Sequence, residues 1–203
     1  MTTFTVATPD RMAELGAAIA AQLGAGDLVL LNGELGAGKT TLTRAIGETL
    51  GIRGTVTSPT FVLARTHPRL DDAGVELSPH HAPPLVHVDA YRLGSAVELD
   101  DLDIDFEASI VIVEWGAGLL DGVSDSWLTV DIARPIGGGA NAHDLPEAGT
   151  GTGSGDDVGT DTDTGAEDAL DDFDDEAIEP RTVTVTGTGP RWTDMEWLNA
   201  VSD

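Results

Sequence analysis

The sequence predicts an α/β fold, a β-sheet with helices packed on its faces, and three observations carry this prediction. Predominantly apolar runs at residues 28–31, 85–88 and 110–113 have the length of buried strands, and a polar residue follows each run. Apolar residues recur at helical spacing in the stretch 12–23. A glycine-rich loop separates the first apolar run from a second helical stretch, residues 39–50. Strands that alternate with helices are typical of a parallel sheet.

The glycine-rich loop has the form of a phosphate-binding loop. Residues Gly33–Thr40 match G-x-x-x-x-G-K-[ST], a pattern in which backbone N–H groups and the positive end of the helix dipole meet phosphate oxygens. Lys39, the only lysine of the chain, is expected to bridge the β- and γ-phosphates, and the Thr40 hydroxyl is expected to bind Mg²⁺. A glycine-rich turn that caps a helix is the alternative. With the flanking strand and helix, the loop predicts a three-layer, P-loop NTPase-like sheet.

The flanking segments have recognisable ends. Thr8, Pro9 and Asp10 have the residue types of an N-cap and a first helical turn, and Gly51 is expected to end the helix that follows the loop. Residues 57–63 are expected to open a second strand. Their hydroxyl groups, fixed by a proline, can place a donor near a γ-phosphate, although an ordinary proline turn is an equal interpretation.

Two predicted strands end in a carboxylate. The run 85–88 is followed by Asp89, and the run 110–113 is followed by Glu114. In a parallel sheet, ligands bind at the carboxyl ends of the strands, where an acid can meet Mg²⁺ or the attacking water. Each acid alone could be a solvated strand end. Because the chain also has a phosphate loop, the pair predicts an NTPase site.

Composition excludes several functions and sets one acidic segment apart from the rest of the chain. The absence of cysteine excludes disulfides and thiolate chemistry, and a net charge of −26 argues against direct gripping of a nucleic-acid backbone. Without a signal peptide or a long apolar run, we expect a cytoplasmic protein with no membrane association. Residues 137–180 contain fourteen acidic residues and no lysine or arginine, and we expect them to be a disordered insertion.

The remaining residues are assigned to one domain. Residues 1–136 form its main part, and residues 181–203 complete it with a strand and a closing helix. We predict that the strand at 181–186 lies beside the strand at 127–132, because a flexible insertion of this length adds only about 2 kcal/mol to the free energy of loop closure.

The combination of motifs resembles one family, the bacterial TsaE (YjeE) proteins, over residues 9–132. The resemblance rests on the segments 26–41, 58–61, 87–92 and 113–115 in this order and spacing. It implies a Mg²⁺-dependent ATPase, weak alone, that acts with the TsaD and TsaB proteins in the threonylcarbamoyladenosine modification of tRNA, so that tRNA is reached only through the complex.

The resemblance also assigns residues. The catalytic residues it implies are Lys39, Asp89 and Glu114, and the ligands of Mg²⁺ are Thr40, Asp89 and Glu114, with the roles of the two acids left open. The residues expected to bind ATP are Gly33, Glu34, Leu35, Gly36, Ala37, Gly38, Lys39, Thr40, Thr41, Ser58 and Thr60. Trp115 is expected to lie beside the site, although core packing explains it equally.

Other functions compete with this interpretation. A small-molecule kinase would need an arginine-bearing lid, and the insertion contains no arginine. A GTPase would need a second lysine for its guanine motif. A nucleotide-sensing adaptor that binds ATP without turnover is the alternative from a different class, and a phosphate-release assay distinguishes it from an ATPase.

Overall fold

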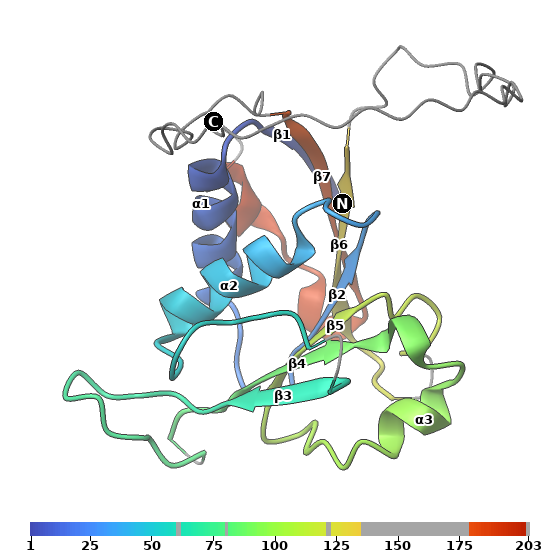
Figure 1. Ribbon diagram of the computed structural model, residues 1–203. Helices are drawn as coiled ribbons and strands as arrows, with labels where there is room; N and C mark the ends of the chain where they lie inside the picture. Colours follow the sequence, from blue (N-terminus) through green and yellow to red (C-terminus); the bar gives the residue numbers. More distant parts are fainter. Residues whose placement is uncertain (60–61, 80, 121–122, 135–178, 202–203) are drawn as a thin grey trace, which may run out of the picture. The chain divides into compact units, whose positions relative to one another are not determined.

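The structure is a computed structural model that describes residues 1–59, 62–79, 81–120, 123–134 and 179–201, which belong to one compact unit. Seven strands form one sheet (Figure 1), and they span Thr2–Val6 (β1), Leu28–Asn32 (β2), Ala64–His67 (β3), Leu85–Asp89 (β4), Ile110–Glu114 (β5), Trp127–Ala133 (β6) and Arg181–Thr188 (β7). The α-helices span Pro9–Ala20 (α1), Lys39–Leu50 (α2) and Ala96–Asp100 (α3). None of the described helices is long and apolar enough to cross a membrane.

The strand order is β1-β7-β6-β2-β5-β4-β3. The four central strands, β6, β2, β5 and β4, are parallel, whereas β3, β7 and β1 are antiparallel to their neighbours. The sheet is therefore mixed, with the phosphate-loop strand β2 in the middle. Because β2, β4 and β5 run in the same direction, the loops and acids at their carboxyl ends meet at one edge of the sheet.

The two faces of the sheet are covered differently. Helices α1 and α2 lie together on one face (Figure 1), where a core of buried side chains joins them to the sheet. The other face packs against Leu99 of α3, Leu120 and the neighbouring loop residues. The expected layers are present, but one outer layer consists mainly of loops and one short helix.

Close packing of α1 against α2 positions the start of α2. A Cβ atom at Gly16 of α1 would lie 2.5 Å from the Cβ atom of Ala45 in α2, so that only glycine allows this approach. Thr8 caps α1 by accepting a hydrogen bond from the backbone N–H of Arg11, and Gly51 ends α2 with a φ of 68°. The start of α1 and the end of α2 were both predicted from the sequence.

Strand β7 pairs with β6 in an antiparallel register from Trp127↔Thr188 to Ala133↔Thr182. This pairing confirms the prediction that these two strands are neighbours in one sheet. The predicted disorder of residues 137–180 falls almost entirely outside the described residues, which resume at Glu179. The division of the chain into an ATPase domain and an insertion stays a prediction.

Three sequence-based assignments differ from the structure. The strand expected to open at residue 57 begins at Ala64, because its edge pairing with β4 begins only there. The closing helix consists of two short 3-10 helices, Pro190–Trp192 and Glu196–Ala200, which pack through Trp192 and Leu198. Strand β1 was not predicted, since its five residues gain stability only from pairing with β7.

Candidate active site

The phosphate loop connects β2 to α2 in a backbone conformation that requires glycine. Gly33, Gly36 and Gly38 have φ values of 147°, 75° and 115°, and Gly38 is the N-cap of α2. A Cβ atom at Gly33 would lie 2.4 Å from the carbonyl oxygen of Ile132 in the neighbouring strand β6. The loop is thus fixed against the sheet at Gly33, while Gly36 has an open environment with Arg134 as the nearest group.

Lys39 lies in the centre of this loop. Its Nζ donates hydrogen bonds to the carbonyl oxygens of Gly33 at 2.8 Å and Glu34 at 3.0 Å, and it lies 3.7 Å from the ring centroid of Trp115. Burial lowers the pKa of the Lys39 ammonium from its ordinary value of 10.5, and the carboxylates of Glu114 and Asp89 act in the opposite direction. An ammonium has three N–H donors, so one donor remains for a phosphate oxygen.

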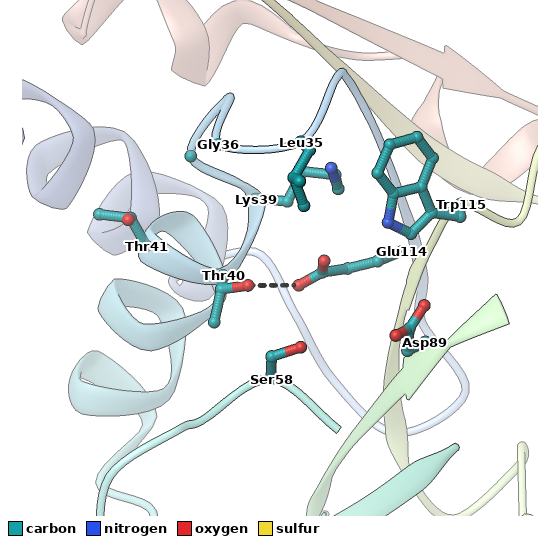
Figure 2. A pocket seen from close by; sticks show the side chains of 10 residues that line it. Leu35, Gly36, Lys39, Thr40, Thr41, Ser58, Asp89, Glu114 and Trp115 are labelled. Atoms are coloured by element: carbon teal, nitrogen blue, oxygen red, sulfur yellow. Dashed lines mark hydrogen bonds between the residues drawn. The ribbon is translucent and has the colours of Figure 1, made fainter. Parts of the chain in front are cut away.

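The two strand-end acids face the loop from neighbouring strands. Asp89 of β4 and Glu114 of β5 are partners in the parallel register, and both are almost fully buried. The Thr40 hydroxyl donates a hydrogen bond to Oε1 of Glu114 at 3.1 Å (Figure 2). Asp89 accepts a hydrogen bond from the backbone N–H of Tyr91 through Oδ1 at 3.1 Å. The carboxyl ends of two strands and the start of α2 thus converge on one site.

A pocket of about 280 Å³ lies between these elements. Ser58 lies on the segment before β3, and Thr41 points away from Glu114 (Figure 2). The lining residues are Leu35, Gly36, Gly38, Lys39, Thr40, Thr41, Ser58, Asp89, Glu114 and Trp115.

Most residues predicted from the sequence therefore line one pocket. Of the others, Gly33 and Glu34 contribute carbonyl oxygens to Lys39, and Ala37 is buried in the core. Thr60 lies outside the described residues.

Two residues that were not assigned to catalysis, ATP or Mg²⁺ also contribute to the site: Trp115, which was expected to lie beside it, and His87, which was not. Trp115 lines the pocket, contacts Lys39, and packs edge-to-face against Tyr91 with ring centroids 5.5 Å apart. His87 is fully buried, and its Nε2 lies 2.8 Å from Oε1 of Glu114. A sequence signal existed, because His87 precedes Asp89 by two residues and strand side chains alternate between faces, which places both on the same face of β4.

Comparison with known proteins identifies the family. A family model described as "Threonylcarbamoyl adenosine biosynthesis protein TsaE" matches residues 6–137. A Streptomyces coelicolor protein named tRNA threonylcarbamoyladenosine biosynthesis protein TsaE is 45% identical over 184 residues, which cover 89% of this chain and 93% of that protein. The chain belongs to the TsaE family.

Another TsaE protein agrees with this assignment, and a solved structure supports the fold. A Mycobacterium tuberculosis TsaE is 46% identical over 129 residues, which cover 59% of this chain and 71% of that protein. The crystal structure of Bacillus subtilis YdiB superposes with a TM-score of 0.54 at 22% identity, covering 99% of this chain and 93% of that one. At this identity the superposition supports the fold. The match 6–137 contains the phosphate loop and both acids, so the candidate site lies within the TsaE region of this chain.

Proposed function

We propose that this chain is a Mg²⁺-dependent ATPase that takes part, together with the TsaD and TsaB proteins, in the threonylcarbamoyladenosine modification of tRNA. The observation that carries the proposal is the convergence of Lys39, Thr40, Asp89 and Glu114 on one pocket at the carboxyl edge of the sheet. The role in threonylcarbamoyladenosine modification is inferred from the family and from the names of its relatives. The net charge of −26 supports an arrangement in which the partners hold the tRNA.

The oxygen donors at the start of α2 fit a magnesium ion. Mg²⁺ prefers oxygen ligands, and the Thr40 hydroxyl lies 3.1 Å from a carboxylate oxygen of Glu114, with Asp89 beside them in the pocket. Thr40 and Glu114 would hold the ion. When bound, Mg²⁺ neutralises the charge that develops on the transferred phosphoryl group.

The protein's own groups would perform the remaining tasks. The loop N–H groups bind phosphate oxygens, and Lys39, held in place by two carbonyl oxygens, directs its remaining N–H at them. Because the Thr40 contact engages Glu114, Asp89 is the acid that we assign to orienting the attacking water. Electrostatic stabilisation by fixed groups in a partly enclosed site is the main source of rate enhancement in phosphoryl transfer.

Phosphate release from MgATP tests the proposal. We expect turnover by the wild type with TsaB and TsaD present and little turnover alone. Lys39→Ala should fold normally and lose turnover by at least about a hundredfold, the effect of removing a group that stabilises transition-state charge. Wild-type turnover in folded Lys39→Ala would place the active site elsewhere. Tight ATP binding by the wild type without phosphate release, with or without the partners, would instead support the nucleotide-sensing adaptor.

A further inference from the structure

A buried histidine contacts the site acid that also contacts Thr40. His87 is completely inaccessible to solvent, and its neighbours in β4 are three apolar residues and the site acid Asp89. Its Nε2 lies 2.8 Å from Oε1 of Glu114. A carboxylate that holds a metal ion only accepts hydrogen bonds, so in the proposed site His87 is the tautomer with its proton on Nε2, and the Nε2–H group donates a hydrogen bond to Glu114.

Oε1 of Glu114 has two donors. The Thr40 hydroxyl approaches it at 3.1 Å and His87 Nε2 at 2.8 Å, from α2 and β4 respectively. With one oxygen held from two elements, the glutamate side chain loses most of its rotational freedom, which restricts the positions that its second oxygen, Oε2, can take. A carboxylate oriented in this way binds metal or water better than a mobile one, because the ordering has already taken place during folding.

Core packing alone explains His87 poorly. Its Nδ1 is buried and has no hydrogen-bond partner among the residues that the structure describes. A buried polar atom without a partner lowers the stability of the fold, and an apolar side chain at this position would avoid that loss. His67 of β3 is a useful comparison. It is also buried and has an unpartnered nitrogen among the described residues, but it is not hydrogen-bonded to Glu114 in the part of the chain that the structure describes.

We propose that His87 is a positioning residue of the ATPase site. It orients Glu114 by a hydrogen bond to Oε1, which leaves Oε2 available to the metal that Thr40 and Glu114 would hold. The inference rests on the proposed function, because it assigns Glu114 to the Mg²⁺ site. It gives His87 no contact with substrate and no proton transfer.

Four variants test this role. His87→Leu fills the space without a donor. In His87→Gln the amide N–H reaches about as far as Nε2, whereas in His87→Asn the shorter amide does not. His67→Leu is the matched control, a buried histidine replaced on the neighbouring strand. For each protein we would measure kcat and KM for ATP with TsaB and TsaD, Mn²⁺ affinity in the presence of ADP by electron paramagnetic resonance, and ADP affinity without metal.

We expect His87→Leu to lose about 10- to 100-fold in kcat and about tenfold in Mn²⁺ affinity, which is the usual effect of removing a group that orients a ligand. KM for ATP and metal-free ADP affinity should stay within about threefold, because the phosphate loop is untouched. His87→Gln should retain most of both properties, His87→Asn should resemble His87→Leu, and His67→Leu should behave as the wild type. If His87→Leu fails to fold, the comparison of His87→Gln with His87→Asn still tests whether the hydrogen bond to Glu114 is needed.

The proposal is overturned if His87→Leu keeps wild-type kcat and Mn²⁺ affinity, if Gln and Asn are equally impaired, or if His67→Leu shows the same losses. The Mn²⁺ measurement also separates this proposal from the proposed function. If the wild type releases no phosphate in any combination of proteins, the ATPase assignment fails, and the Mn²⁺ affinities still show whether His87 positions Glu114.

Discussion

Replacing Gly33 by alanine should destabilise the protein far more than the same replacement at Gly36. A Cβ atom at Gly33 would lie 2.4 Å from the carbonyl oxygen of Ile132 and 3.0 Å from the Cβ atom of Ala37. A Cβ atom at Gly36 would have Arg134 Nη1 as its nearest neighbour, at 3.7 Å. Both glycines have positive φ values, 147° and 75°, so both variants also carry backbone strain.

The expected loss of folding stability in each variant follows from these contacts. Strain at positive φ costs about 1–2 kcal/mol in either variant. Only Gly33→Ala adds a steric conflict with the backbone of β6, which costs about 1–3 kcal/mol more, as overpacking does elsewhere. For a domain of this size the additional loss corresponds to a melting temperature lower by about 3–9 °C than that of Gly36→Ala. Gly36 lines the pocket, so Gly36→Ala should mainly weaken ATP binding, by about tenfold, if a side chain costs one phosphate contact.

Thermal unfolding followed by circular dichroism, together with ATP affinity from calorimetry, measures both effects. The control is the wild type treated identically. Equal melting temperatures for the two variants would contradict the packing of the loop against β6. Unchanged ATP affinity in Gly36→Ala would show that no phosphate approaches the backbone at that position.

Two further predictions concern the acids and the insertion. Asp89→Asn should lose turnover but keep the Mn²⁺ affinity measured in the presence of ADP, whereas Glu114→Gln should weaken that affinity by about tenfold. Electron paramagnetic resonance measures the Mn²⁺ affinity. The reverse pattern would mean that Glu114 orients the water and Asp89 holds the metal. Replacing residues 137–180 by a short Asn-Gly turn should preserve turnover with TsaB and TsaD and raise the free energy of unfolding by about 2 kcal/mol, since a shorter connection between β6 and β7 is easier to close. Loss of folding or of turnover in the deletion variant would show that the segment has a structural or functional role.

Much of the site could be predicted because its signals are local. The phosphate loop needs glycine at positions of positive φ, followed by lysine and a hydroxyl residue. All of these residues lie within eight consecutive positions, 33–40. The ends of α1 and α2 were equally predictable, since the capping residues Thr8 and Gly51 act within one helical turn. Asp89 and Glu114 could be placed together because parallel strands end at the same edge of a sheet.

Other features depend on contacts between distant parts of the chain, and only the tertiary structure decided them. The bond from His87 to Glu114 joins residues 27 positions apart. Strand alternation places His87 on the same face of β4 as Asp89, but only the folded structure shows that it reaches Glu114. The same holds for Lys39 and Trp115, whose contact requires the loop and the end of β5 to lie side by side.

The sequence by itself determined the phosphate loop, the central strands and the acids, because hydrophobic periodicity and backbone conformation are properties of neighbouring residues. It did not determine the edges of the fold. Strand β1, the start of β3 and the two C-terminal 3-10 helices are short segments with weak intrinsic preferences, and each takes its conformation from the partner that it packs against. The orientation of Glu114 belongs to the same class, since it depends on hydrogen bonds from two elements that meet only in the folded protein.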